Sequence, residues 1–378
     1  MHEPLRIGLI GAGQIGTQHL ITYSQIPEVN VVAVADLFPE KVEAARQRFA
    51  VSDGYADFQE MLARDDIDAV DVCVHNNKHA PLTIAALKAG KHVYCEKPMA
   101  GTYRDAANML ETAREQGRML HIQMATLYEA ETRAARRLIE DGHLGKIYYA
   151  RSFGYRRRGR PFVDGYGTAN FVNKSISAGG ALFDMGIYHI AQILFLMGNP
   201  AVKTVTGAAH QELDMYEERR AFSGYSVEEM GLGWVRMEGG ISFDIEESWA
   251  VHHDGQEASK ILGSRGGLRL NPLTYFSSLS DMPYSAAFDT KAADTRWHAC
   301  FPETRWYGSS QRHWAGALLG HVPLLPTAEI GLNAALISEG IYLSSQAGRE
   351  FTADEIRTQS RSAAIDPSTP EKVWKELQ

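Results

Sequence analysis

The first third of the chain alternates short apolar runs with longer amphipathic stretches. The runs have the length of β-strands, and the stretches between them repeat apolar residues every three or four positions, as helices do. The predicted strands are Leu5–Ile10, Val29–Ala35, Ala69–Val74, His92–Cys95 and Met119–Met124, and the predicted helices are Gln14–Gln25, Pro39–Phe49, His79–Ala89 and Thr102–Gln116. Strands and helices that alternate with short connections predict a parallel sheet covered by helices on both faces.

After about residue 145 the pattern changes to longer runs that alternate apolar and polar positions. These runs predict strands at Lys146–Phe153, Val202–Ala209, Val227–Met237 and Ile241–Trp249, with apolar helices at Ala181–Met197 and Glu329–Ala347. Glu238-Gly239-Gly240 joins the last two strands and is a hairpin signal. Residues 271–310 show no clear period, and they are interpreted as a long loop over the site or a contact with another subunit.

We therefore expect an α/β protein of two domains. Residues 1–125 would form the parallel-sheet domain. Residues 126–378 would form an α/β domain with an open mixed, largely antiparallel sheet, whose final helix at 329–347 packs back near the first domain. A chain of 378 residues is long enough for two such cores.

Composition narrows the possible partners and compartment. The chain has 38 basic and 46 acidic residues, a net charge of −8, which disfavours general nucleic-acid binding. The chain has three cysteines, and so small and odd a number disfavours a disulfide framework. No apolar run reaches the roughly 18 residues of a membrane span, and the N-terminus leads straight into the first strand. We expect a cytoplasmic protein without nucleic-acid or membrane partners.

The loop Gly11-Ala12-Gly13-Gln14-Ile15-Gly16 lies between the first predicted strand and helix. In such a loop the glycines allow a tight turn, close approach of a pyrophosphate and close helix packing, while the helix N-terminus attracts the phosphates. Asp36 lies twenty residues past the last glycine, where it would accept hydrogen bonds from ribose hydroxyls. Leu37 follows, and offers no cation to a 2′-phosphate. The loop thus predicts a Rossmann unit that binds NAD rather than NADP, through Gly11, Gly13, Gln14, Ile15, Gly16, Asp36 and Leu37.

The fourth predicted strand ends in Tyr94-Cys95-Glu96-Lys97-Pro98. A lysine at the carboxyl end of a parallel strand points into the crevice where ligands bind. There Lys97 could donate a hydrogen bond to a substrate oxygen or relay a proton, and Pro98 restricts its backbone.

On these residues the chain resembles the Gfo/Idh/MocA oxidoreductases. The resemblance extends over nearly the whole chain: the glycine loop, the turn from Asn76 to His79, and the segments 89–98, 141–146, 179–186 and 263–267. It implies a Rossmann domain, a second domain whose sheet commonly forms the interface of a homo-oligomer (a dimer or tetramer), and hydride transfer at a sugar or polyol carbon. It also implies that the nicotinamide lies beside Lys97, with Asn76, His79 and Glu96 on the cofactor side.

Members of this family often carry an aspartate and, four residues later on a helix, a histidine. Here Tyr188 lies four residues after Asp184, and His189 lies five after it. On an α-helix those offsets fall about 40° and about 140° around from Asp184. We therefore predict Tyr188 as the proton donor or acceptor, with Lys97 holding the reacting hydroxyl and Asp184 orienting the substrate. His189 is the second candidate, because an irregular helix start could turn it inward.

Other basic residues and histidines are considered as substrate contacts or metal ligands. Lys174 precedes the Gly179-Gly180 turn and is a candidate substrate contact. His75 and His79 have the spacing of a metal pair, but no third ligand is evident, and we expect no metal. Arg151, Arg156, Arg157, Arg158 and Arg160 could clamp an anionic substrate, although a solvated strand edge explains most of them.

The sequence thus predicts an NAD-dependent dehydrogenase or reductase acting on a sugar, a sugar derivative or a cyclitol. One alternative is an NAD-using glycosidase or lyase with no net redox change. Another is a regulator that keeps the fold and senses NAD, although a sensor has no need of Lys97, Asp184 and Tyr188.

Overall fold

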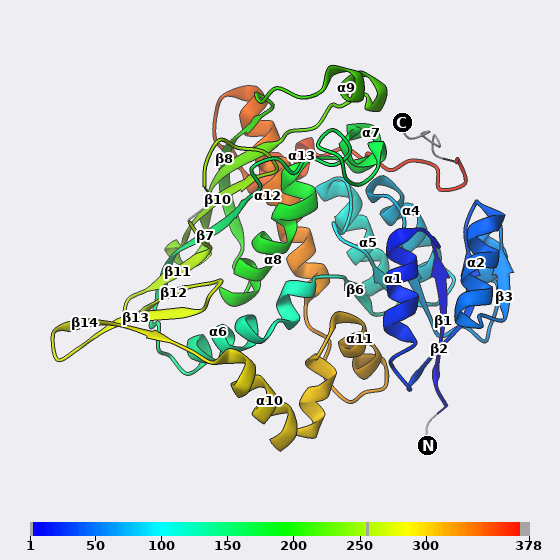
Figure 1. Cartoon of the computed structure of the whole chain (residues 1–378), viewed down its shortest axis with the longest axis horizontal. Helices are drawn as coiled ribbons and strands as arrows, with labels where there is room; N and C mark the ends of the chain where they lie inside the picture. The colour runs from blue at the N-terminus through cyan, green and yellow to red at the C-terminus, as the bar shows by residue number, and fades with distance from the viewer. Residues whose placement is uncertain (1–2, 255–256, 371–378) are drawn as a thin grey trace. The chain divides into compact units, whose positions relative to one another are not determined.

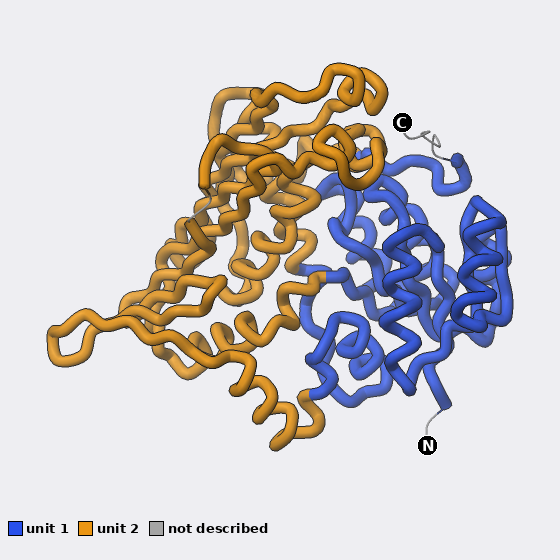
Figure 2. Tube along the Cα trace, in the orientation of Figure 1, with its two compact units in different colours: residues 1–123, 305–329, 362–373 blue, residues 124–304, 330–361, 374–378 orange. Residues whose placement is uncertain are grey.

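A computed structural model describes residues 3–254 and 257–370. The chain divides into two units, neither of them continuous in sequence (Figure 2). Of the described residues, the first unit comprises 3–123, 305–329 and 362–370, and the second comprises 124–254, 257–304 and 330–361.

The first unit is built on a six-stranded parallel sheet in the order β3-β2-β1-β4-β5-β6. Its strands are β1 Leu5–Ile10, β2 Val29–Ala35, β3 Asp53–Tyr55, β4 Ala69–Val72, β5 His92–Cys95 and β6 Leu120–Ile122. The five predicted strands are all present. The sequence pattern missed β3, because a strand of three residues is too short to show a period. The strand order reverses between β1 and β4, and in such sheets ligands bind at the carboxyl ends of the strands at this point.

Helices cover both faces of this sheet (Figure 1). On one face, β1 packs against α1 Gln14–Tyr23 and α2 Pro39–Phe49 in a cluster that includes Leu9, Leu20 and Val42. On the same face Tyr94 of β5 packs against Trp314 of α11 Ser310–Leu318. The opposite face carries α4 Asn76–Lys88, α5 Tyr103–Glu115 and also α3 Phe58–Leu62, because a Cβ at Gly8 of β1 would lie 3.1 Å from Met61. This is the predicted Rossmann arrangement, with the late segment 305–329 added to it.

The second unit contains a nine-stranded sheet in the order β14-β13-β12-β11-β7-β10-β9-β8-β15. Its strands are β7 Ile147–Tyr155, β8 Val202–His210, β9 Met230–Met237, β10 Ser242–Ser248, β11 Lys260–Gly263, β12 Gly267–Arg269, β13 Thr274–Leu279, β14 Met282–Ala287 and β15 Phe351–Thr352. Neighbours β7 and β10 run parallel, and the other recorded pairs are antiparallel. The open, mixed, largely antiparallel sheet is confirmed, as is the hairpin through Glu238–Gly240.

One face of this sheet is covered by α8 Ile187–Leu196 and α12 Thr327–Ala347 (Figure 1). Helix α12 approaches closely, because a Cβ at Gly207 or Gly233 would lie about 3 Å or less from side-chain atoms of Ile341. The other face exposes aromatic rings, among them Trp234 on β9 and Phe276 on β13. The remaining helices of the unit are α6 Ala130–Glu140, α7 Lys174–Ser177, α9 Glu217–Ser223, α10 Thr290–Cys300 and α13 Ala353–Gln359.

The stretch 271–310, interpreted above as a long loop over the site or a contact with another subunit, is not an irregular loop but a β13–β14 hairpin followed by α10. Most positions of β14 are exposed on both faces, so the strand has no apolar side to produce an alternating pattern. The periodicity that reveals a half-buried strand is therefore missing here.

One helical stretch, Lys174–Leu196, is long and apolar enough to span a membrane by length and composition. Most of it is buried within the second unit, where it supplies core residues such as Leu182 and Ile190.

Candidate functional site

The glycines of the first loop have distinct structural reasons. Gly11 has a φ of +98°, and a Cβ there would lie 2.3 Å from the carbonyl oxygen of Cys73. A Cβ at Gly16 would lie 1.9 Å from the carbonyl oxygen of Gly11. Around the Cβ position of Gly13, no atom of the described residues lies within 4 Å apart from those of Gly13 itself and its two chain neighbours. The outer glycines therefore permit the turn and the packing of α1, and the middle one leaves backbone open to a ligand.

The N-terminus of α1 lacks a side-chain cap: its N-cap is Gly13, and no side-chain hydrogen bond is made there. The first-turn N–H groups, starting with that of Gln14, receive no side-chain cap from Gly13, and an anion can take the place of such a cap, with the helix dipole in its favour. Ile15 is 44% exposed beside them despite being apolar. These features fit a bound dinucleotide pyrophosphate.

Asp36 is tied to this loop. Its carboxylate accepts hydrogen bonds from the backbone N–H of Ala12 at 2.8 Å and of Phe38 at 3.0 Å. Asp36 and Leu37 are both partly exposed at the end of β2. The acid is therefore held at the edge of the glycine loop, where the sequence predicted a ribose contact.

Glu96 and Lys97 follow β5 at the carboxyl edge of the sheet. Glu96 is buried, and Lys97 is half-buried. The backbone N–H of Lys97 donates to Glu96 Oε2 at 2.9 Å. His79, in the first turn of α4 that begins at Asn76, lies with Nδ1 2.7 Å from the carbonyl oxygen of Pro98. The segment that carries Lys97 is thus held on both sides.

The ring of His79 is fully buried, and its Nε2 lies 3.0 Å from the carbonyl oxygen of Val74. Burial lowers the pKa of His79. Both ring nitrogens lie close to backbone carbonyls, so His79 supports the turn from within.

Sequence reasoning missed a polar cluster beneath this edge. His19 of α1 lies between Asp71 of β4 and Glu96, and Cys73 contacts its ring. Cys73 is buried, and its sulfur lies 3.1 Å from His19 Nδ1. The one signal in the sequence was an acid, Asp71, inside an otherwise apolar strand.

In the second unit a π-helical turn, Leu182–Gly186, precedes α8. A π-turn closes its hydrogen bonds one residue later than an α-turn, so it rotates the following residues backward around the axis. The angles of a regular α-helix, from which Tyr188 was favoured, therefore do not hold between Asp184 and His189. The irregular start that the second candidate required is present.

His189 pairs with Glu247 of β10. Its Nδ1 lies 2.9 Å from Glu247 Oε2, and Ser152 donates to Glu247 Oε1 at 2.6 Å. Glu247 is fully buried, and the side chain of His189 is 24% exposed. Since a carboxylate only accepts hydrogen bonds, Nδ1 carries a proton and Nε2 is the nitrogen that titrates. Burial opposes protonation of the ring, but the Glu247 carboxylate outweighs it and raises the pKa of His189.

Two glycines make room for this pair. A Cβ at Gly154 of β7 would lie 2.5 Å from Glu247 Oε2 and 2.5 Å from His189 Cε1. A Cβ at Gly186 would lie 2.9 Å from Glu247 Cγ. The backbone is thus shaped around the histidine–carboxylate pair.

Asp184 and Tyr188 lie on the same segment. Asp184 accepts a hydrogen bond from Trp249 Nε1 at 3.1 Å and lies 3.7 Å from a guanidinium nitrogen of Arg156. Tyr188 is half-buried, and its carbonyl accepts from Thr126 Oγ1 at 3.0 Å.

The arginines between residues 151 and 160 lie in different surroundings. Arg160 is fully buried and forms ion pairs with Asp164 at 2.9 Å and Glu229 at 2.8 Å, so the solvated-edge interpretation is wrong for it. Arg151 pairs with Asp244, Glu246 and Glu257 on the outer face of the sheet. The exposed Lys174 places its ammonium 5.0 Å from the ring centre of Tyr342, at the rim of a pocket in the second unit.

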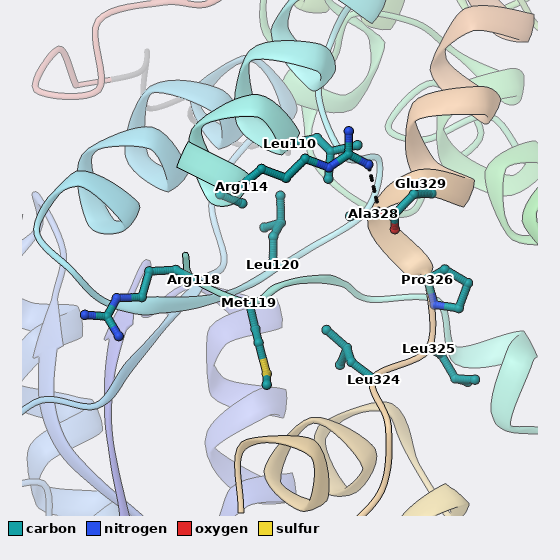
Figure 3. Close-up of a pocket in the computed structure, with 11 residues that line it drawn as sticks. Leu110, Arg114, Arg118, Met119, Leu120, Leu324, Leu325, Pro326, Ala328 and Glu329 are labelled. Carbon is teal, nitrogen blue, oxygen red and sulfur yellow. Dashed lines mark hydrogen bonds and ion pairs between the residues drawn. The ribbon is translucent and has the colours of Figure 1, made fainter. Parts of the chain in front are cut away.

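A pocket in the first unit lies at the other edge of the parallel sheet (Figure 3). Met119 and Leu120, at the amino end of β6, line it together with Leu324, and Arg114 pairs with Glu329 across its rim at 3.2 Å. The glycine loop and Lys97 follow the carboxyl ends of their strands, so this pocket is separate from them.

Comparison with known proteins agrees with this architecture. Residues 5–124 match the model of the oxidoreductase family with an NAD-binding Rossmann fold, and residues 132–269 match the GFO/IDH/MocA C-terminal domain. The D-glucoside 3-dehydrogenase of Escherichia coli is 32% identical over 278 residues, covering 71% of this chain and 78% of that protein. The myo-inositol 2-dehydrogenase of Thermotoga maritima is 29% identical over 194 residues, covering 51% and 55%.

Solved structures show the same fold at low identity. An oxidoreductase domain protein from Kribbella flavida superposes with a TM-score of 0.78 at 21% identity, over 93% of this chain and all of that one. A levoglucosan dehydrogenase in complex with NADH and levoglucosan gives a TM-score of 0.75 at 21% identity, with the same coverage. The chain belongs to the Gfo/Idh/MocA oxidoreductase family, and it is an NAD-dependent oxidoreductase.

Proposed function

We propose that the protein transfers a hydride between NAD and a hydroxyl-bearing or keto carbon of a sugar, a sugar derivative or a cyclitol. The observation that carries this proposal is the His189–Glu247 pair, a base oriented by a buried carboxylate in the unit that does not carry the NAD-binding loop. The names of the relatives support the substrate class, since they include a glucoside and an inositol dehydrogenase.

In this proposal the first unit holds the cofactor. Backbone N–H groups of Gly13, Gln14, Ile15 and Gly16 bind the pyrophosphate, and Asp36 binds the adenosine ribose. Leu37, the next residue, offers no cation to a 2′-phosphate. Asn76, at the start of α4, contacts the nicotinamide side. When bound, NAD accepts or supplies the hydride. Glu96 and His79 act on the cofactor side indirectly, by fixing the segment of Lys97.

The protein's own groups handle the proton. Lys97 donates a hydrogen bond to the reacting oxygen and stabilises negative charge on it. His189 Nε2 takes the hydroxyl proton during oxidation and returns it during reduction, while Glu247 holds the ring and stabilises the imidazolium. Asp184, fixed by Trp249 and faced by Arg156, binds a neighbouring hydroxyl of the substrate. Lys174 is a more distant substrate contact.

Tyr188 remains the competing proton partner, and paired variants separate the two. We expect His189→Asn to lower kcat for oxidation by about a hundredfold or more, and Tyr188→Phe to lower it by less than about tenfold.

The pH profile of kcat gives an independent check. Because the pKa of His189 is raised and oxidation needs its neutral form, activity should fall as the pH drops through that raised pKa. Glu247→Gln should move this acid limb to lower pH. The reverse ranking of the two variants would assign the proton to Tyr188.

A panel of sugars, glycosides and cyclitols, offered with NAD and NADP in parallel, tests the reaction itself. We expect NADH to form in one-to-one proportion with oxidised substrate, and NAD to be preferred because Asp36 repels a 2′-phosphate. A hydrolysed or dehydrated product with the cofactor unchanged would instead assign the glycosidase or lyase reaction. NAD binding without turnover of any panel member, together with full biological activity of Lys97→Met, would favour the sensor.

We also propose that the outer face of the nine-stranded sheet pairs with a second copy of the chain. This face exposes Trp234 at 39% and Phe276 at 42%, with Tyr149 against Trp234 at 6.2 Å between ring centres. Exposed aromatic rows of this kind are typical of association surfaces. Light scattering should give a mass of at least twice 41.9 kDa, and Trp234→Arg should lower it. A monomeric wild type would contradict the proposal.

A further inference from the structure

A buried polar cluster beneath Lys97 contains groups to which the proposed reaction gives no role. It consists of His19, Asp71, Cys73 and Glu96, hereafter the His19 cluster. His19 is 3% exposed, Asp71 is 0% exposed and Glu96 is 7% exposed. Buried charges are costly unless they are paired, so the pairing of these groups and their purpose need an explanation.

The two ring nitrogens of His19 face different carboxylates. Nδ1 lies 2.8 Å from Asp71 Oδ2, and Nε2 lies 2.9 Å from Glu96 Oε1. An ionised carboxylate only accepts hydrogen bonds, and a neutral imidazole has a single N–H, so both contacts are made only by the imidazolium. Burial opposes that charge, but the Asp71 carboxylate outweighs it and raises the pKa of His19.

The other groups around the ring carry no charge. Burial raises the pKa of the Cys73 thiol, which donates to Asp71 Oδ1 at 3.3 Å. Burial likewise raises the pKa of Tyr23, on α1 near Asp71. Tyr94 of β5 presents its ring to His19 edge-on at 5.6 Å. The cluster is therefore a carboxylate–imidazolium–carboxylate row enclosed by neutral side chains.

Three of these residues are of metal-ligand type and lie close together. Their spacing argues for hydrogen bonds instead. Ligand atoms around a tetrahedral zinc ion stand about 3.3 Å or more apart, whereas His19 Nδ1 and Asp71 Oδ2 are separated by 2.8 Å. His19 Nε2 is also engaged by Glu96, so both ring nitrogens have partners without an ion.

Glu96 connects the cluster to Lys97. One of its oxygens accepts from His19, and the other accepts from the backbone N–H of Lys97 at 2.9 Å. The two contacts fix the plane of the carboxylate, and the Glu96 charge also acts electrostatically on the Lys97 ammonium. A chain of hydrogen bonds thus runs from Asp71 through His19 and Glu96 to the backbone of Lys97.

We propose that His19 is a positioning residue for Lys97: it holds Glu96 ionised and oriented, and Glu96 in turn fixes the backbone of Lys97 and the field at its ammonium. The catalytic consequence rests on the function proposed for Lys97. The structural part does not, because it concerns the protonation and placement of Lys97 in the protein without substrate.

The test measures Lys97 directly. The full-length protein is treated with limiting acetic anhydride across a pH series, and acetylation of Lys97 is quantified by mass spectrometry. Glu96→Gln keeps the side-chain shape but removes one negative charge, so the pH of half-maximal modification should fall by about one unit. In His19→Gln the pH of half-maximal Lys97 modification should also shift, because Glu96 without the imidazolium either takes up a proton or leaves its position.

His121→Gln is the matched control. His121 is a fully buried histidine of the same unit, but its nitrogens face the hydroxyls of Ser310 at 3.1 Å and Thr327 at 2.9 Å. Its loss should leave the modification of Lys97 unchanged. In turnover, His19→Gln should lower kcat about 10- to 100-fold, with the Kd for NAD within about twofold of wild type.

An unchanged Lys97 profile in both His19→Gln and Glu96→Gln would overturn the proposal. If His19→Gln does not fold, Glu96→Gln decides alone by the same measure. A shifted Lys97 profile combined with full activity of Lys97→Met would leave the positioning role standing and refute the proposed function instead.

Discussion

Replacing Lys97 by methionine should lower kcat by about a thousandfold, while the affinity for NAD changes little. Methionine keeps most of the length and apolar stem of the lysine, but it removes the hydrogen-bond donor and the positive charge that would stabilise the reacting oxygen. Stopped-flow measurement of NADH formation, with NAD binding followed separately by fluorescence, distinguishes the two effects. Lys88→Met, an exposed lysine at the end of α4, is the matched control and should behave as wild type.

The double variant Lys97→Met/His189→Asn shows whether the two residues serve one step. Groups that act together on the same transition state give strongly non-additive losses. We expect the double variant to be little slower than the slower single variant. Losses that multiply would mean that Lys97 and His189 contribute to separate steps, and a fully active Lys97→Met would remove Lys97 from the mechanism.

The second large effect is expected from a single methyl group at Gly154. In Gly154→Ala the new Cβ would lie 2.5 Å from both Glu247 Oε2 and His189 Cε1, so the pair has to separate. Overpacking of this kind costs about 1–3 kcal/mol of folding stability. Displacement of the acid–base group by about 1 Å costs about a hundredfold in kcat. Thermal unfolding and steady-state kinetics on the same preparation measure both.

Gly267→Ala provides the comparison within the same sheet. Its Cβ would meet a methyl carbon of Leu262 at 3.0 Å, a flexible neighbour on the adjacent strand β11. It should cause a small loss of stability and no loss of kcat. If Gly154→Ala kept the wild-type kcat, and if the acid limb of its pH–activity profile did not shift, the His189–Glu247 pair would have no part in turnover.

Local sequence pattern predicted most elements of the first 123 residues, but not β3, α3 or the segment 305–329 that belongs to the same unit. Strand β1, the glycine loop and α1 are adjacent in the chain, and the apolar run and glycine spacing that predict them lie within that stretch, although the partners of β1 are the distant strands β2 and β4. Asp36 and Lys97 could be placed for the same reason, since each follows directly on a strand whose carboxyl end is known from the pattern. The mixed sheet of the second unit was also predictable, because β8, β9 and β10 each keep one apolar face.

Only the tertiary structure decided which groups face one another. His189 and Glu247 are 58 residues apart in sequence, and His19 and Glu96 are 77 residues apart, so no local period relates them. The turn before α8 lies against β7 and β10, and it is a π-turn, which the 3.6-residue period does not predict. Sequence period reports which face of an element is buried, whereas the pairing of buried charges depends on contacts between distant elements.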